Sequence, residues 1–157
     1  MNVAMHTLEL KIPPLALVIL IAVAMWGASL LVQSTDLSLE ARLIAAATFI
    51  LLGCGISLAG VLSFRRAKTT VNPTKPNSTS ALVDSGIYGI TRNPMYLGFF
   101  FILIGWACFL ANALALLGPV SFVIYMNRFQ ITPEERALSG IFGAEFNAYK
   151  AKVRRWL

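Results

Sequence analysis

This chain of 157 residues has little of what most metal, disulfide and nucleotide sites are built from. It contains two cysteines and one histidine, His6, which argues against a disulfide framework and leaves too few side chains for a metal site. It has no glycine-rich phosphate loop or dinucleotide fingerprint, so a nucleotide-like cofactor would have to be held in another way. Only 13% of the residues are charged and 57% are hydrophobic, a composition that favours a membrane protein.

Long apolar runs fill most of the sequence. The first two carry no charge and reach the length of about 20 residues that a helical span needs. The last run is too long for one span and has Asn112 near its middle, which predicts a tight helical hairpin. We therefore expect an all-α protein, a polytopic membrane helical bundle in a single domain, 1–157. Its four transmembrane helices are predicted at about 12–32, 43–64, 94–111 and 113–128.

Positive charge lies in two places along the chain. The segment 65–92 holds five Lys or Arg residues, whereas the connection between the first two spans holds only Arg42. Six more cationic residues follow the last span: Arg128, Arg136, Lys150, Lys152, Arg154 and Arg155. The positive-inside rule then predicts an integral membrane protein with both termini cytoplasmic. The brevity of the chain favours a bacterial inner membrane. The net charge of +6 indicates attraction to anionic lipid and not nucleic acid binding, because the basic residues flank spans.

Two segments outside the spans have patterns of their own. The segment 65–92 mixes prolines with apolar residues, which predicts an ordered cytosolic loop lying on the membrane surface. The segment 133–153 has the spacing of an amphipathic helix. Such a helix could either rest on lipid or close a site, and the pattern leaves both open.

Two polar segments next to apolar runs are the candidates for chemistry. Asn93 precedes Pro94, and Thr132 precedes Glu134 and Glu135, so both segments have the form of a helix N-terminus and could do no more than cap one. The same geometry suits a ligand, because helix N-termini attract carboxylates and phosphates. Arg92 could grip a planar anion, and the two glutamates could accept from an ammonium group or from ribose hydroxyls. Together they would recognise a zwitterionic amino-acid moiety.

At this point the sequence resembles a known family. The run 92–98 resembles the Arg-His-Pro-x-Tyr-x-Gly signature of the isoprenylcysteine carboxyl methyltransferases, and its Asn-Pro-Met-Tyr resembles the variant in related phospholipid methyltransferases. The region 134–149 resembles the Glu-Glu and Phe-Gly-x-Glu-Tyr region of the family. The segments 69–73 and 85–88 are similar to segments of its bacterial members, and the likeness covers about 53–156.

The resemblance implies a membrane enzyme that uses S-adenosylmethionine in a cytosolic pocket. By matching position, the cofactor site would contain Gly86, Tyr88, Arg92, Asn93, Tyr96, Gly98, Glu134 and Glu135. Arg92 and Glu135 are the predicted catalytic residues, and no metal is expected. Asn93 stands where the prenylcysteine enzymes have histidine, so a role that needs imidazole there is in doubt.

The methyl acceptor stays open among a lipophilic carboxylate, a thiol and a lipid amine. A carboxylate or thiolate needs no general base, whereas an amine needs one, and Glu135 or Glu134 would be the nearest. Two other functions stay open as well: a non-enzymatic four-helix membrane scaffold and a nicotinamide-dependent membrane reductase. The oligomeric state is not predicted. The methyltransferase hypothesis requires Arg92 and Glu135 to meet in one site.

Overall fold

The computed structural model describes residues 9–31, 35–67 and 81–157, and its regular structure within these ranges is all helical. This confirms the all-α part of the predicted fold class, while the four transmembrane spans stay a prediction. His6 and most of the predicted surface loop, residues 68–80, lie outside the described residues. The first four α-helices in these ranges are α2 (Pro14–Ser29), α3 (Leu39–Arg66), α4 (Pro94–Leu110) and α5 (Leu117–Tyr125). The remaining elements are η2 (Gly86–Gly89), η3 (Ala113–Leu116), the π-helical η4 (Met126–Ile131), α6 (Thr132–Phe142) and α7 (Ala144–Lys152).

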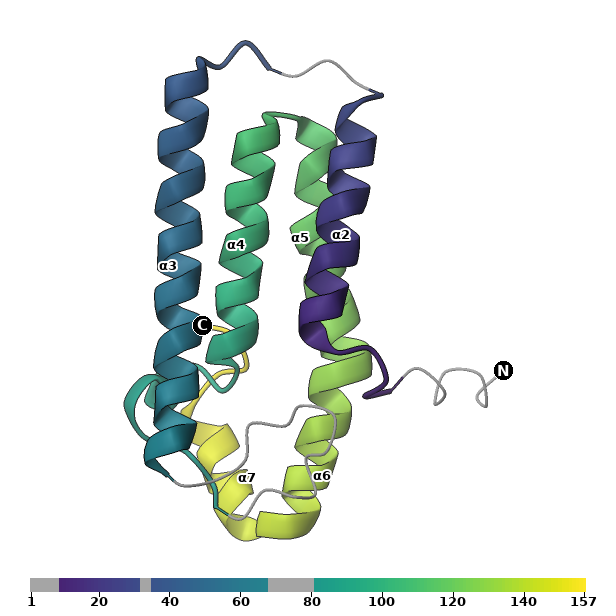
Figure 1. The fold of residues 1–157 in the computed structure, drawn as a ribbon. Coiled ribbons are helices and arrows are strands. Elements are labelled where there is room, and N and C mark those ends of the chain that lie inside the picture. The colour runs from purple at the N-terminus through teal and green to yellow at the C-terminus, as the bar shows by residue number, and fades with distance from the viewer. Residues whose placement is uncertain (1–8, 32–34, 68–80) are drawn as a thin grey trace, which may run out of the picture.

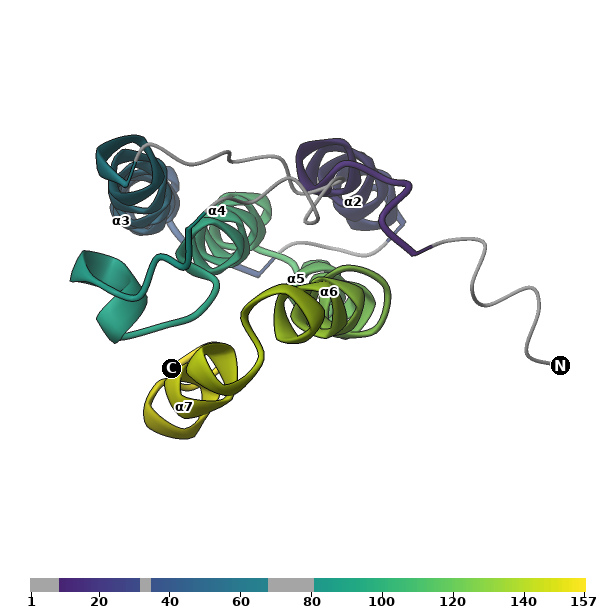
Figure 2. The same cartoon turned by 90° about the horizontal axis from the view of Figure 1, so that it is seen from below.

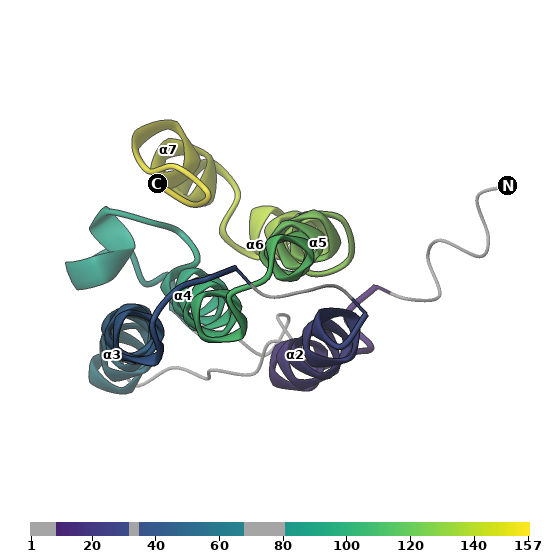
Figure 3. The same cartoon turned by 90° about the horizontal axis from the view of Figure 1, so that it is seen from above.

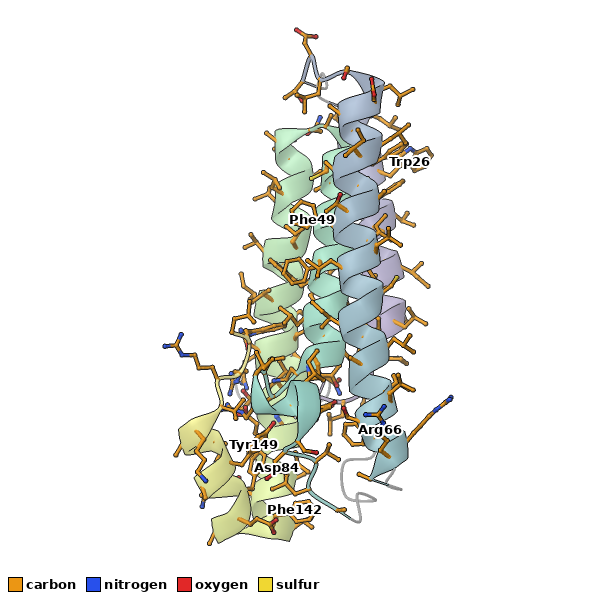
Figure 4. The ribbon with its side chains drawn as sticks, turned by 90° about the vertical axis from the view of Figure 1, so that its left-hand side faces the viewer. Trp26, Phe49, Arg66, Asp84, Phe142 and Tyr149 are labelled. Atoms are coloured by element: carbon orange, nitrogen blue, oxygen red, sulfur yellow. The ribbon has the colours of Figure 1, made fainter. Side chains whose placement is uncertain are left out.

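The helices form an elongated bundle with a wider base (Figure 1). Seen along its length, α4 lies between α3 and the helix formed by α5 and α6, with α2 beside α5 (Figure 3). From the opposite side, η2 and α7 lie beside the ends of α3, α4 and α6 (Figure 2). Figure 4 shows the labelled Trp26 near one end of the bundle, and Tyr149 and Phe142 near the other. The polar residues singled out in the sequence belong to the second end, which we call the base.

The small residues of α3 pack against α4. The buried positions of α3 are Ala46, Gly53 and Gly60, at a spacing of seven that keeps them on one face. A methyl group at Gly53 would lie 2.5 Å from the carbonyl oxygen of Gly98 on α4. A methyl group at Gly105 would lie 2.9 Å from the carbonyl oxygen of Ala46. Glycine at these positions lets the two helix backbones approach closely.

Apolar side chains are divided between a narrow core and an exposed outer surface. The core is centred on Leu103, Phe122, Met126 and Ile131, which are almost completely buried. The outer surfaces of α2 and α3 remain apolar and exposed. Two helices, Leu39–Arg66 and Ala113–Phe142, are long and apolar enough to cross a membrane, whereas α2 and α4 are shorter apolar helices. An apolar helix that the protein itself does not bury is typical of contact with lipid.

The structure shows no break between the predicted helix end at 128 and the predicted helix start at 133, for which Thr132 was the expected cap. The helix that begins at Ala113 continues to Phe142, with a π-helical stretch in the middle. The Thr132 hydroxyl does not cap but donates back to the carbonyl of Asn127 at 2.7 Å. Pro133 has no N–H for the carbonyl of Phe129, four residues earlier, and the backbone N–H of Leu10 donates to that carbonyl at 3.0 Å instead. The hydrogen bond from Leu10 satisfies the carbonyl of Phe129, so Pro133 is tolerated in the interior of the helix.

The predicted amphipathic helix 133–153 is two helices. Gly143 separates α6 from α7 with φ of +51° and ψ of −117°, a conformation that suits glycine and breaks the hydrogen-bonding pattern. The chain turns there, so α7 lies beside α6 at the base (Figure 1). Phe146 and Tyr149 of α7 then pack with Val153, Leu82, Leu138 and Phe142 in a second apolar cluster. The apolar spacing seen in the sequence therefore builds an interface between protein elements and not one lipid-facing stripe.

Candidate functional site

Arg92 and Glu135 meet at the base of the bundle although 43 positions separate them. Arg92 precedes α4, Glu135 lies in the first turns of α6, and the Arg92 Nη2 donates to Glu135 Oε1 at 2.8 Å. The two side chains are 12% and 16% exposed, so the pair is largely shielded from solvent. Arg92 Nη1 also donates to the backbone carbonyls of Lys150 and Val153. This single guanidinium therefore ties α4, α6 and the end of α7 together.

Glu135 is held by two arginines. Arg155 Nη2 donates to Oε2 at 2.5 Å and Arg155 Nε donates to Oε1 at 3.1 Å, so the contact is bidentate. Burial raises the pKa of Glu135, but the hydrogen bonds and charges of Arg155 and Arg92 outweigh it and leave the pKa below its usual value. Glu135 is consequently an anion at neutral pH.

Glu134 has different surroundings from its neighbour. Its Oε1 accepts from the Tyr96 hydroxyl at 2.6 Å and from Gln130 Nε2 at 2.6 Å. The apolar part of the long helix ends at Ile131, so we treat Glu134 as lying outside the membrane-spanning segment. Burial raises the pKa of Glu134 to about 7, even though the hydrogen bonds from Tyr96 and Gln130 lower it. Glu134 can therefore gain and lose a proton near neutral pH.

Tyr88 and Tyr149 extend this polar cluster. The Tyr149 hydroxyl donates to the backbone carbonyl of Tyr88 at 2.7 Å, and Phe64 of α3 packs edge-on against the Tyr88 ring. Burial raises the pKa of the Tyr88 phenol, and the charges of Tyr149 and Glu134 raise it further. The phenol therefore stays protonated at neutral pH and can serve as a hydrogen-bond donor in the same region as Glu134.

The other predicted site residues occupy varied places. Asn93 stands at the N-cap position of α4, but its side chain makes no cap and its Nδ2 donates to the carbonyl of Arg155 at 2.9 Å. Gly86 opens η2 with φ of +62° near Ser63 and is exposed. Gly98 packs against Gly53 and Ser57 of α3. These contacts give Gly98 a packing role, and its assignment to the cofactor site stays a prediction.

Three residues of the polar cluster were not singled out in the sequence: Asn127, Gln130 and Arg155. Gln130 lies four residues before Glu134, so the two share a helix face once the helix is known to be continuous. The misplaced helix boundary concealed this signal. Arg155 looked like one of several surface cations, and nothing in its local sequence indicates that it contacts Glu135.

The protein is thus a bundle of apolar helices with a polar site at its base, in which Arg92 and Arg155 pair with Glu135. A family model described as phospholipid methyltransferase matches residues 41–145, which is well over half of the chain. The chain belongs to this family of methyltransferases, as the sequence motifs predicted. The family and the long apolar helices together identify an integral membrane protein.

Curated relatives agree with this assignment. A protein-S-isoprenylcysteine O-methyltransferase of Saccharomyces cerevisiae is 34% identical over 128 residues, which are 75% of this chain and 52% of the yeast protein. The enzyme of the same description from Homo sapiens is 35% identical over 80 residues, 49% of this chain and 27% of its own. An uncharacterized protein of Haemophilus influenzae is 49% identical over 63 residues, 40% of this chain and all of its own length. The matched part of this chain thus spans about half of the yeast enzyme and about a quarter of the human enzyme. No solved structure matches.

Proposed function

We propose that this protein transfers a methyl group from S-adenosylmethionine to a lipophilic acceptor at the cytosolic face of a membrane. The observation that carries the proposal is the shielded contact between Arg92 and Glu135, inside the region that the family model matches. Four helices would cross the membrane: α2, α3, α4 and the apolar part of the long helix that begins at Ala113. The base, with its site, would face the cytosol.

The polar groups at the base fit the amino-acid end of this cofactor. The Nε atom of Arg92 is buried and has no hydrogen-bond partner among the residues that the structure describes. An unpaired buried donor is costly unless a ligand accepts from it. A carboxylate would satisfy it. Glu134, which accepts from two neutral groups and contacts no arginine in these hydrogen bonds, could accept from an ammonium group. An anion-binding and a cation-binding group thus stand on neighbouring elements.

The chemistry asks little of the protein beyond alignment. S-adenosylmethionine would supply a methyl group that its sulfonium already activates. Arg92 would orient the carboxylate end, and Glu135 would keep Arg92 in place. Tyr96 and Tyr88 would line the region beside Glu134 as hydrogen-bond donors. The elements around the base would exclude water from the reacting groups.

A proton acceptor is available if the acceptor is an amine. Glu134 has a pKa of about 7, near the ideal for a general base at neutral pH, whereas the two arginines keep Glu135 a poor base. The general-base assignment therefore moves from either glutamate to Glu134. A carboxylate or thiolate acceptor would leave Glu134 without this task. The curated relatives are named as O-methyltransferases and the family model as phospholipid methyltransferase, so the acceptor class stays within this range.

Calorimetric titration of the purified full-length protein with S-adenosylmethionine tests the proposal. The protein should bind the cofactor, and Arg92→Ala and Glu135→Ala should each weaken binding by about tenfold or more, the loss expected for hydrogen bonds to charged groups. Arg136→Ala is the matched control, because Arg136 adjoins Glu135 in sequence but pairs with Glu9. Absence of binding by the intact protein, or tighter binding of NADPH, would overturn the proposal.

A further inference from the structure

The segment 153–156 runs alongside residues 91–93 at the base. Thr91 and Arg154 form a parallel β-bridge, and the backbone N–H of Arg92 donates to the carbonyl of Arg154 at 3.0 Å. The carbonyl of Arg155 accepts from Asn93 Nδ2 at 2.9 Å and from the Thr91 hydroxyl at 3.3 Å. In Figure 1 the yellow end of the chain turns back from α7 toward the ends of α3 and α4. The segment is thus fixed directly against the residues that carry Arg92.

Two side chains of this segment point into the bundle and share an acceptor. Arg155 Nη1 and Trp156 Nε1 both donate to Asn127 Oδ1, at 3.3 Å and 3.1 Å. The Trp156 ring packs against the main hydrophobic core. Asn127 belongs to the π-helical η4, a geometry that often accompanies functional sites. The segment is therefore anchored on both the α4 side and the long-helix side of the site.

The neighbouring arginines 154 and 155 differ sharply. Arg154 is exposed, as a surface cation near anionic lipid would be. Arg155 is part-buried and uses Nε, Nη1 and Nη2 on Glu135 and Asn127. A solvated basic tail would need no such arrangement. The fork of Arg155 fixes both oxygens of Glu135, and this fixes the oxygen that Arg92 meets.

We propose that Arg155 is a positioning residue that orients Glu135 toward Arg92, so that segment 153–156 completes the cofactor site. This inference rests on the proposed function, because the site it completes is the proposed S-adenosylmethionine site. Arg155 acts through Glu135 and Arg92 and does not itself touch the reacting groups. The segment that carries it is consequently part of the binding machinery and not a passive tail.

Calorimetry with S-adenosylmethionine on three full-length variants tests the inference. Arg155→Gln, which removes the charge and the fork, should raise the Kd about tenfold or more, as expected for bonds to a charged group. Arg155→Lys restores the charge but not the fork and should recover part of the affinity. Lys152→Ala, the control at an exposed cation of α7 outside the segment, should bind like the wild type. A wild-type Kd for Arg155→Gln would overturn the inference.

A second measurement separates this inference from the proposed function. In the protein without ligand, Glu135→Gln and Arg155→Gln together should lower the melting temperature by less than the sum of their separate effects, because both remove the same contact. Additive effects would overturn the inference whether or not the cofactor binds. If the wild type fails to bind S-adenosylmethionine, the proposed function is wrong. The double-mutant cycle of Glu135 and Arg155 still tests whether the two side chains interact.

A conservative variant covers the case in which Arg155→Gln does not fold. Trp156→Phe keeps an aromatic ring in the core and removes only the hydrogen bond to Asn127. Loosening this anchor should weaken cofactor binding by about threefold, the size of one ordinary hydrogen bond. An unchanged Kd in Trp156→Phe would then overturn the inference.

Discussion

Adjacent residues Glu134 and Glu135 have opposite electrostatic surroundings. Glu135 receives two guanidinium groups, whereas Glu134 receives a phenol and an amide. The pKa of Glu135 is lowered although burial opposes this, and burial raises that of Glu134 to about 7. Separation of pKa values between two carboxylates is a common way to give them different tasks. Glu135 can hold a fixed charge while Glu134 exchanges a proton.

The pH dependence of stability should report the Glu134 environment. Its pKa is higher in the folded protein than the ordinary 4.5, so the folded state keeps a proton that the unfolded chain has lost between these values. The contribution of Glu134 to the free energy of unfolding therefore falls as the pH rises from about 4.5 to 7. The fall amounts to up to about 3 kcal/mol, since a pKa difference of one unit corresponds to about 1.4 kcal/mol. Glu134→Gln keeps the acceptor oxygen and should remove this fall.

Thermal unfolding of the wild type and variants between pH 5 and pH 8 measures the effect. Stabilisation by Glu135, whose pKa is lowered, is lost only as pH falls below this range, so it does not obscure the result. Glu145→Gln, at an exposed carboxylate of α7, should follow the wild type. Parallel curves for wild type and Glu134→Gln would contradict the assigned environment.

The local sequence could indicate Arg92 and Glu135 as candidate site residues, but it could not predict which side chains contact them. Their types and neighbours, a proline-led helix and an acidic pair, indicate charge at the ends of apolar runs. The contact of Arg155 with Glu135 depends on the turn at Gly143 and on the return of segment 153–156 along Thr91. Such a contact between distant segments has no periodicity that a sequence could display.

At the scale of elements, the close pairing of α3 and α4 supports the site, because α4 begins next to Arg92. The pairing depends on glycines that bring the two backbones together. Gly53→Ala would place a methyl group 2.5 Å from the carbonyl of Gly98, a backbone atom that cannot rotate away. We expect the variant to lose about 1–3 kcal/mol of unfolding free energy, typical of overpacking.

Gly55→Ala is the control on the same helix. A methyl group at Gly55 meets nothing within 4 Å, so only the helix preference changes, and stability should stay equal or rise by about 0.5–1 kcal/mol. Thermal unfolding of both variants in the same detergent provides the comparison. Equal destabilisation at the two positions would show that the contact between α3 and α4 is not the cause.

The apolar runs predicted α2, α3, α4 and the helix that begins at Ala113, but Pro133 led to a wrong prediction of one helix boundary. Pro133 was interpreted as a first helical residue, which is its commonest place in a helix. In the structure the π-helical η4 and the donor from Leu10 satisfy the backbone around it. That donor lies more than a hundred residues earlier, so the chain near Pro133 gave no sign of a continuous helix.

At the scale of the molecule, helix length relates the site to the membrane. Glu134 lies 21 residues after Ala113 on one continuous helix, or about 32 Å at about 1.5 Å per residue. The hydrocarbon core of a bilayer is about 30 Å thick, so a helix that enters at Ala113 would bring Glu134 out at the opposite surface. With 16 and 17 residues, α2 and α4 are shorter than this thickness. Such helices would stand nearly perpendicular to the membrane plane, or the bilayer would become thinner around them.

The distribution of cations predicts which side of the membrane the base faces. The described cations at the base include Arg65, Arg66, Lys150 and Lys152, whereas Arg42 lies near the start of α3, at the opposite end. The positive-inside rule predicts that the base faces the cytoplasm, where the proposed cofactor is available. Single cysteines introduced at Ser38 and at Lys152, both exposed, should therefore lie on opposite sides of the membrane.

Labelling of intact cells with a membrane-impermeant maleimide tests this orientation. The native Cys54 and Cys108 are first replaced by alanine, and this background without added cysteine is the control. Ser38→Cys should react in intact cells, and Lys152→Cys only after the membrane is opened. The reverse pattern would place the base outside and remove the cytosolic supply of cofactor on which the proposed methyl transfer depends. Reaction of both positions in intact cells would contradict the proposed topology, in which three spans separate residues 38 and 152.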